Sequence, residues 1–225
     1  MKKTLIFIAI AAAFTACKKE VSSKVDQDKI WTYYELFYDQ NADVTYATAT
    51  FRFSSEIGTH LELSNPSVVS VEGMEMSWVS ESAYYELQFS GIKSTAEFVW
   101  TDLDGNVFTN SIGLRDIDFP AVIDDTLFHS DEVNYFMWEG LPLDSFETAR
   151  ITLAGEGDSD DRKFFVDTLN ATTITIDSLK LLQVDSGMVT IMLDKLYSPP
   201  LTEATSRGGL LVGKYRPVNR LIYLD

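Results

Sequence analysis

The feature that most constrains the fold of this chain is the alternation of side-chain types at every second position. In residues 45–53 the alternation separates Thr, Ala and Phe on one side from Tyr, Thr and Arg on the other. Side chains two residues apart lie on one face of a β-strand, whereas a helix repeats every 3.6 residues. The same period recurs in residues 61–63, 84–89 and 96–100. The sequence therefore predicts half-buried strands in these segments.

A second run of short alternating segments follows a predicted boundary at residues 116–120. Acidic residues there favour a turn, and Pro120 interrupts strand pairing. Before the boundary, the Asp104-Gly105 dipeptide predicts a hairpin turn. No stretch has the pattern of a long amphipathic helix. The remaining strands are expected at residues 30–38, 133–138, 149–153, 163–166, 172–176, 188–193 and 210–224.

Part of the second run has a more specific order. A strand, a crossing segment with leucines, a glycine turn and another alternating strand follow one another, at Ile174, Ile176, Leu179, Leu182, Gly187, Val189, Ile191 and Leu193. This order resembles the corner between strands E and F of immunoglobulin-like and fibronectin type III domains, although Met188 stands where those domains carry a tyrosine. The resemblance covers residues 126–224. The predicted fold is all-β, with two tandem β-sandwich (Ig-like) domains at residues 30–118 and 119–225.

The first residues have the order of a secretory signal peptide. Lys2 and Lys3 precede ten apolar residues, 5–14, and small residues then lead to Cys17, the single cysteine of the chain. The apolar run is too short to span a bilayer. Its tail resembles the lipobox of bacterial lipoproteins. That resemblance implies removal of residues 1–16 and a lipid on Cys17.

Residues 18–29 are polar and charged, with two isolated valines. Such a segment buries too little apolar surface to fold alone, so residues 17–29 are expected to form a lipidated flexible tether. Lipobox, tether and tandem sandwiches together resemble outer-membrane lipoproteins of the Bacteroidetes. The resemblance implies attachment to the outer membrane through the lipid, with the cell surface favoured over the periplasmic face. It also implies a role as a glycan binder or an accessory part of an outer-membrane assembly.

The strong acidity of the chain limits its partners. The formal net charge is −16 at pH 7. A body of this charge repels nucleic acid and anionic lipid headgroups. Nucleic acid is therefore not expected as a partner, and the membrane is expected as a partner only through the lipid anchor.

Residues with catalytic chemistry are scarce. The two histidines, His60 and His129, are predicted to lie on the surface, and Ser130 and Asp131 cannot form a triad with His129 because neighbouring side chains do not converge. No nucleophile elbow, zinc-protease or phosphate-loop motif is present. The chain is therefore not expected to be an enzyme. No cofactor is expected either. One acidic loop is expected to be a solvated strand connection, with structural calcium as the alternative: Glu156, Asp158, Asp160 and Asp161.

Two groups of residues are expected to contact a partner or a glycan. The first strand carries four large aromatic residues that a strand with alternating faces cannot all bury: Trp31, Tyr33, Tyr34 and Tyr38. Basic residues gather near the C-terminus of this acidic chain, either to pair internally or to dock an acidic partner: Arg207, Lys214, Arg216 and Arg220.

Two functional hypotheses follow. The first is a lipid-anchored, non-catalytic interaction module that serves as an accessory subunit or adaptor of a larger outer-membrane protein complex. The alternative is a glycan-binding lipoprotein of the cell envelope, with exposed aromatic rings as its platform. Both hypotheses rest on the same three features: a lipid anchor, β-sandwich domains and the lack of a catalytic motif in the sequence.

Overall fold

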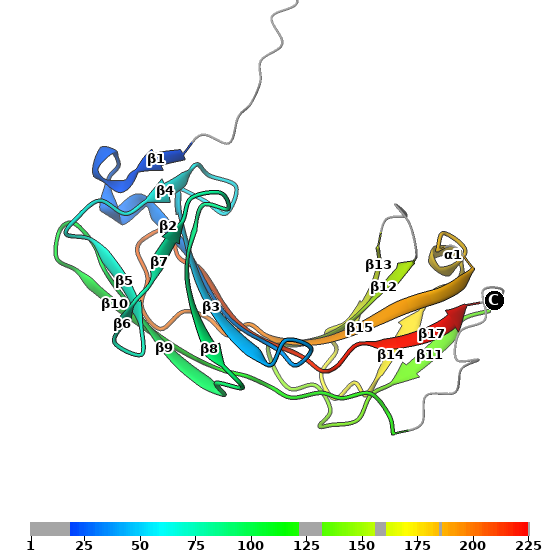
Figure 1. The fold of residues 1–225 in the computed structure, drawn as a ribbon. Coiled ribbons are helices and arrows are strands. Elements are labelled where there is room, and N and C mark those ends of the chain that lie inside the picture. Colours follow the sequence, from blue (N-terminus) through cyan, green and yellow to red (C-terminus); the bar gives the residue numbers. More distant parts are fainter. Residues whose placement is uncertain (1–18, 122–131, 156–160, 185, 225) are drawn as a thin grey trace, which may run out of the picture.

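A computed structural model describes residues 19–121, 132–155, 161–184 and 186–224 of the chain. Strands make up 55% of the structure and helices 5%, which confirms the all-β prediction (Figure 1). The signal peptide, Cys17, His129 and three of the four residues expected to bind calcium lie outside the described residues. Within the described ranges, no helix has the length and apolar character needed to cross a membrane.

The N-terminal half packs two sheets around one hydrophobic core. Its strands in the large sheet are β2 (Ile30–Asp39), β3 (Val44–Phe53), β4 (His60–Glu62), β7 (Ser77–Val79) and β8 (Tyr84–Ser90). A four-stranded sheet covers them, in the order β10 (Val107–Gly113), β9 (Thr95–Thr101), β5 (Val68–Val71) and β6 (Met74–Glu75). The predicted Asp104-Gly105 hairpin is the β9–β10 pair. Tyr34, Phe98 and the fully buried Trp100 lie in the core between the two sheets.

The C-terminal half has its own core. Its strands in the large sheet are β12 (Glu147–Gly155), β13 (Arg162–Val166), β15 (Gly187–Tyr197) and β17 (Arg220–Leu224). The core is covered by the pair β11 (Asn134–Met137) and β14 (Thr173–Ile176) and by the short helix α1 (Ser178–Leu181). In the expected leucine-bearing crossing, Leu181 is the buried residue, whereas Leu179 and Leu182 are exposed.

One strand joins the two halves. β16 (Gly209–Arg216) runs parallel to β2 of the first half and antiparallel to β15 of the second, so that eleven strands form one sheet. Leu211 of β16 lies in the first core, and Tyr215 packs against the second. A Cβ at Gly213 would lie 2.5 Å from the Gly113 carbonyl oxygen, so β16 approaches β10 as closely as glycine allows. The predicted strand 210–224 is therefore two strands, which are separated at Pro217.

The segment predicted to be a flexible tether is structured from Lys19 onward. β1 (Lys19–Val21) pairs in parallel with β4, and two 3₁₀ turns, η1 (Ser22–Lys24) and η2 (Gln27–Lys29), lead into β2. Ser22 is fully buried and accepts a hydrogen bond from the Ser64 backbone N–H at 2.8 Å. The Gln27 side chain donates to the Ser22 carbonyl oxygen at 2.9 Å. Polar side chains that bond to backbone groups stabilise a segment that composition alone predicts to be flexible.

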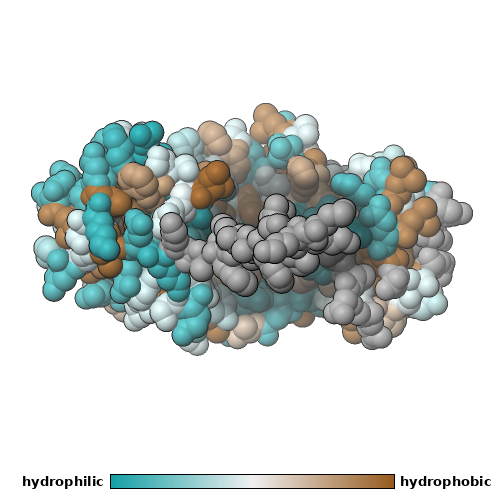
Figure 2. All heavy atoms as spheres, turned by 90° about the horizontal axis from the view of Figure 1, so that it is seen from above, coloured by the Kyte–Doolittle hydropathy of each residue, from teal (hydrophilic) through white to brown (hydrophobic). Residues whose placement is uncertain are grey.

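The large sheet curves, and the two halves of the molecule rise on the same side of it (Figure 1). We call the inner side of this curve the concave face. Seen from that side, hydrophobic atoms are exposed in both halves of the molecule (Figure 2). The division of the chain into two domains stays a prediction, although the large sheet runs through both predicted domains.

Candidate binding face

A groove lies on the concave face over β2, β3 and β8. Its volume is about 410 Å³. Four aromatic rings line it together with two carboxylates and two hydroxyl groups; the residues are Tyr33, Glu35, Phe37, Tyr46, Thr48, Thr50, Tyr84 and Glu86. We call these residues the aromatic groove.

Strand alternation and register bring these residues together. Tyr33, Glu35 and Phe37 occupy alternate positions of β2, opposite to the buried Tyr34 and Leu36. In the β-ladder, Glu35 pairs with Thr48, which pairs with Glu86, and Phe37 pairs with Tyr46. Residues directly opposite on neighbouring antiparallel strands have side chains on the same face, about 5 Å apart. The groove is therefore a direct result of the pairing of β2, β3 and β8.

Hydrogen bonds join two of the groove's tyrosines, Tyr33 and Tyr84, to its two carboxylates. The Tyr33 hydroxyl donates to Glu35 Oε2 at 2.9 Å, and the Tyr84 hydroxyl donates to Glu86 Oε2 at 3.1 Å. Burial raises the pKa of both tyrosines, and the neighbouring glutamate raises it further. Both hydroxyls therefore stay protonated near neutral pH. Each carboxylate keeps acceptor capacity for a ligand, because an ionised carboxylate accepts several hydrogen bonds.

The Phe37 ring closes one side of the groove and leads to a cluster of charged residues. Its centroid is 6.0 Å from that of Tyr46, with the ring planes 26° apart. On the other side, Lys214 of β16 is paired in register with Phe37, and its ammonium nitrogen lies 3.9 Å from the Phe37 centroid. This distance is within the range of a cation–π contact.

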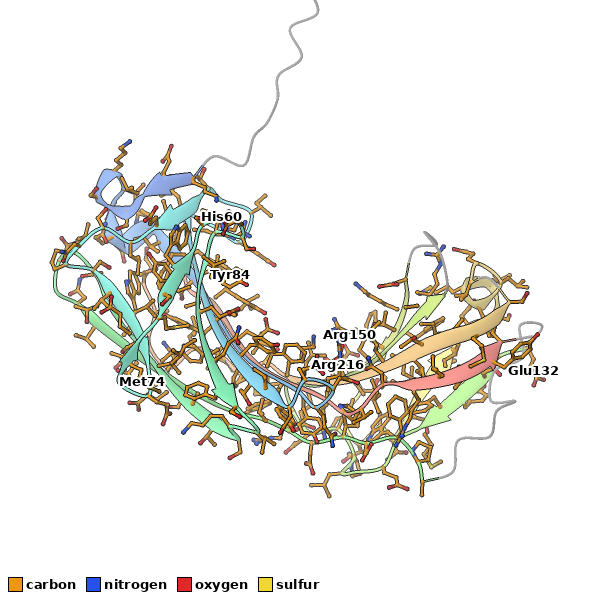
Figure 3. The ribbon with its side chains drawn as sticks, viewed as in Figure 1. His60, Met74, Tyr84, Glu132, Arg150 and Arg216 are labelled. Carbon is orange, nitrogen blue, oxygen red and sulfur yellow. The ribbon has the colours of Figure 1, made fainter. Side chains whose placement is uncertain are left out.

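The charged residues are Arg150, Asp194, Lys214 and Arg216, which we call the Asp194 cluster. Arg150 Nη2 lies 2.6 Å from Asp194 Oδ2, and Arg216 Nε lies 2.7 Å from Asp194 Oδ1. Lys214 Nζ is 3.8 Å from the same carboxylate, whose side chain is fully buried. Arg150 and Arg216 point into the concave side from β12 and β16 (Figure 3). Asp194 thus fixes three cations at the floor of the concave face.

Burial and neighbouring charges shift the pKa values of Asp194 and Lys214 in opposite directions. Burial alone would raise the pKa of Asp194, but the hydrogen bonds from Arg216 and Arg150 and the charge of Lys214 outweigh it, so the pKa lies below its ordinary value. Burial lowers the pKa of Lys214, and Asp194 offsets only part of this effect. Asp194 is therefore ionised at neutral pH. A further anion beside Lys214 would favour its charged form.

The aromatic residues predicted from the first strand divide between the two faces. Tyr34 and Tyr38 are buried on the core side, and the Tyr38 hydroxyl donates to Asp43 Oδ1 at 2.9 Å. Trp31 stacks on Tyr33 with the ring planes 9° apart and is 9% exposed. Of these four aromatic residues, the structure places Tyr33 in the groove. β2 buries so many rings because it lies between β3 and β16 in the middle of the sheet.

The basic residues predicted near the C-terminus also divide. Lys214 and Arg216 join the Asp194 cluster, whereas Arg207 and Arg220 are exposed elsewhere, the latter with its guanidinium carbon 5.9 Å from the Phe119 centroid. Sequence reasoning missed Arg150. The alternation of residues 149–153 places Arg150 on the face opposite to the apolar residues, which was the available signal.

Most of the groove was also missed from the sequence. The residues missed are Glu35, Phe37, Tyr46, Thr48, Thr50, Tyr84 and Glu86. Alternation separates the polar face of each strand from its core face, but it does not say which strands are neighbours. The register between β2, β3 and β8 was needed to bring these residues into one groove.

The structure describes one of the four residues of the expected calcium site and one of the two histidines. Asp161 is exposed, while Glu156, Asp158 and Asp160 lie outside the described residues. Among the residues that the structure describes, no three His, Cys, Asp or Glu side chains are grouped to hold a metal ion. His60 Nδ1 lies 3.0 Å from the Ala83 carbonyl oxygen, and burial lowers the pKa of its imidazole.

A larger cavity, of about 830 Å³, lies at the side of the first sandwich. Trp78 and Tyr85 line it, with their ring centroids 4.9 Å apart. Tyr85 is buried, its oxygen accepts the Leu63 backbone N–H at 2.7 Å, and burial raises its pKa to about 12. Tyr85 is part of the buried core, so its ring is not free to contact a ligand. This cavity therefore presents fewer aromatic rings to a ligand than the aromatic groove does.

No family model and no curated protein matches this sequence. Solved structures that are similar to the chain include two ice-binding adhesins and one protein of a glucan utilization locus. The first is a Ca²⁺-stabilized adhesin of an Antarctic bacterium, with 10% identity over 87% of this chain and 49% of that chain and a TM-score of 0.26. The second is a 1.5-MDa bacterial ice-binding adhesin, with 11% identity over 87% of this chain and 64% of that one and a TM-score of 0.24.

The third is SGBP-B of the Bacteroides ovatus mixed-linkage glucan utilization locus, solved in complex with a mixed-linkage heptasaccharide. It is 10% identical over 91% of this chain and 62% of that chain, with a TM-score of 0.20. The chain thus spans about half of the length of the first of these proteins and under two thirds of the other two. Likeness at this level says nothing about the ligand of this chain.

Proposed function

We propose that this protein is a lipid-anchored, non-catalytic binding module of the bacterial outer membrane and that it binds a glycan chain along its concave face. The single observation that carries the proposal is the aromatic groove. Anchoring and location rest on the lipobox-like sequence that ends at Cys17. The ligand class rests on the chemistry of the groove.

The groove combines the two kinds of contact that a sugar ring requires. A pyranose ring has apolar C–H faces, which pack on aromatic rings, and a rim of hydroxyl groups, which need hydrogen-bond partners. Phe37 and Tyr46 supply neighbouring rings in the groove. Glu35 and Glu86, each held by a tyrosine hydroxyl, supply acceptors beside those rings. An open groove on a rigid sheet admits a polymer without a large rearrangement.

The test is affinity electrophoresis of the full-length protein in detergent through gels that contain different polysaccharides. Phe37→Ala and Tyr46→Ala should each weaken retardation about tenfold, because each removes one stacking ring. Tyr135→Ala is the matched control, since Tyr135 is 67% exposed on β11 of the second half. Retardation that is unchanged in both groove variants would reject the groove as the glycan site.

A protein partner is the second candidate ligand, and a different part of the concave face favours it. Phe165, Leu221 and Tyr223 are 64%, 64% and 51% exposed. In register, Phe165 pairs with Arg150, and Leu221 and Tyr223 pair with residues of β15 on the Asp194 side. Exposed apolar side chains gathered on one face commonly mark protein contacts.

Purification of the tagged protein from native membranes in mild detergent tests this second candidate. A specific partner should be lost with Phe165→Ser and Leu221→Ser but retained with Leu179→Ser, a change at a 70% exposed leucine of α1. A protein that elutes alone and as a monomer in every case would exclude the adaptor role.

A further inference from the structure

We infer that the Asp194 cluster is a subsite for a carboxylate group of the bound glycan, so that the ligand is a polysaccharide with carboxylate substituents. This inference rests on the proposed glycan-binding function and names its substrate class. The juxtaposition that carries it is Lys214, which touches both the aromatic groove and the cluster.

The cluster is continuous with the groove along one row of the sheet. Tyr46, Phe37 and Lys214 are successive partners across β3, β2 and β16. Arg216 follows Lys214 by two positions on β16 and lies 5.5 Å from the Phe37 centroid. A sugar bound in the groove against Phe37 would therefore place its substituents beside the cations. Neighbouring strands are about 4.8 Å apart, so the backbones of Phe37 and Lys214 are separated by one strand spacing.

The cations of the cluster remain accessible to a ligand from the solvent side. Three cations surround one carboxylate, and that carboxylate is fully buried beneath them. The side chains of Arg150, Arg216 and Lys214 are 28%, 18% and 13% exposed. Asp194 therefore holds the cations in place from below, and a ligand meets the cations first.

Besides Asp194, the carboxylates of Glu35 and Asp39 act on the charge of Arg216, and both are engaged by neighbours. Glu35 accepts the Tyr33 hydroxyl at 2.9 Å. Asp39 accepts the Asn41 side-chain N–H at 2.7 Å and the Asn41 backbone N–H at 3.0 Å. Hydroxyl groups of a sugar are suitable partners for their remaining oxygen lone pairs. The floor of the concave face thus offers acceptors for hydroxyls and cations for an acid within one site.

Because the whole protein is acidic, an acidic ligand can bind only where positive charge is concentrated, as it is in the Asp194 cluster. At a net charge of −16, the surface as a whole repels a polyanion. Arginine and lysine held in fixed positions provide charge-assisted hydrogen bonds, which are about twice as strong as neutral ones. Binding of an acidic polymer therefore has to come from a local cationic site of this kind.

Two matched pairs of polymers test the inference in affinity electrophoresis of the full-length protein. The pairs are polygalacturonate with its methyl ester, and hyaluronate with its carboxyl-reduced form. In at least one pair the acidic polymer should bind about tenfold more tightly than its neutral form, which is the effect of one charge-assisted hydrogen bond at a partly exposed site. This comparison uses the unaltered protein and needs no variant to fold.

Lys214→Met locates the subsite. Methionine keeps the apolar contact with Phe37, and Asp194 retains its two arginines, so the fold should be preserved. The variant should lose most of the preference for the acidic polymer and keep its affinity for the neutral form. Lys24→Met, the same change at an exposed lysine of η1, should leave both affinities unchanged.

Different results would reject the acidic subsite and the glycan-binding function. Equal binding of both members of each pair, or a preference that survives Lys214→Met, would overturn the acidic subsite, while a loss of binding in Phe37→Ala would still support the groove. If no polymer of any kind binds, the glycan-binding function and the inference fail together.

Discussion

The two halves of the concave face are built by the same rule and differ in chemistry. Over β2, β3 and β8 the face carries aromatic rings paired with carboxylates, whereas over β13, β15 and β17 it carries exposed apolar side chains. Both halves bury a similar apolar set on the opposite face. The buried faces therefore determine the fold, and the concave face is where the side chains of the two halves differ in chemistry. The Asp194 cluster lies between the two.

The halves also differ in how independent they can be. Each has its own core and its own covering strands, but β16 contributes Leu211 to the first core and packs Tyr215 against the second. A strand hydrogen-bonded to both halves should couple their unfolding. Substitutions in each core, at the junction and in the groove test how far the two halves depend on each other.

The largest effect is expected from core truncation. Trp100→Ala in the first half and Phe136→Ala in the second each remove a side chain that is at most 1% exposed. Each should lower the free energy of unfolding by about 3–5 kcal/mol. Because β16 serves both halves, urea denaturation followed by circular dichroism should show one transition in both variants. Two separate transitions, of which only one moves, would show that the halves are independent.

The next effect is expected at the junction. Asp194→Asn leaves three clustered cations without their buried counter-charge and should lower the free energy of unfolding by about 3 kcal/mol at pH 7. Asp161→Asn, at an exposed position of the second half, should change it by less than about 0.5 kcal/mol. Similar losses in the two variants would contradict a structural role for the cluster.

The pH dependence of the Asp194→Asn effect follows from the direction of the pKa shift. A carboxyl whose pKa is lowered in the folded state contributes stability above its ordinary value of 3.8, and this contribution is lost as the pH falls through the lowered pKa. The difference between the native protein and Asp194→Asn should therefore stay constant from pH 7 to pH 5 and shrink at lower pH. A difference that grows on acidification would reverse the sign of the shift.

A smaller effect is expected where β16 crosses the first half. Gly213→Ala places a methyl group against the Gly113 carbonyl oxygen and should cost about 1–3 kcal/mol through overpacking. Leu210→Ala, on the same strand but 41% exposed, should cost less. Thermal unfolding of the two variants side by side measures the difference. A neutral Gly213→Ala would mean that β16 and β10 can move apart freely.

The smallest effect is expected in the groove. Tyr33→Phe removes the hydroxyl that donates to Glu35 and should lower the free energy of unfolding by about 1 kcal/mol. Tyr135→Phe, at an exposed tyrosine, should be neutral. Urea denaturation checks both. A loss of several kcal/mol in Tyr33→Phe would mean that the groove is part of the core and is not a surface free to bind.

The fold class and many strands could be predicted from the sequence because alternation is a local property. The strand expected at residues 45–53 is β3, and the segment expected at 149–153 lies within β12. The pairing of β16 with β2 could not be predicted, because residues 209–216 and 30–39 are distant in sequence and no local pattern specifies partners. The structured segment at Lys19–Lys29 was also missed, since its order depends on bonds to residues near Ser64.

For the candidate site, too, local patterns in the sequence could be read, but contacts between distant strands could not. Tyr33, Lys214 and Arg216 were identified from unusual composition, which a sequence shows directly. Trp31, Tyr34 and Tyr38 were expected to face a partner, but their burial depends on which strands flank β2. Arg150 and Asp194 are unremarkable as single residues, and they gain a role only because β12, β15 and β16 are neighbours.

The pairing of β1 with β4 determines how closely the folded body must stay to any lipid on Cys17. Lys19 is already part of the sheet edge, and two residues of extended chain span at most about 7 Å. If Cys17 carried a lipid, the folded body would therefore have to stay close to the bilayer. That distance is below the screening length of roughly 8 Å at physiological ionic strength, so the acidic body would experience the charge of the headgroups beneath it. A membrane with few anionic headgroups at the point of attachment would hold it with the least repulsion.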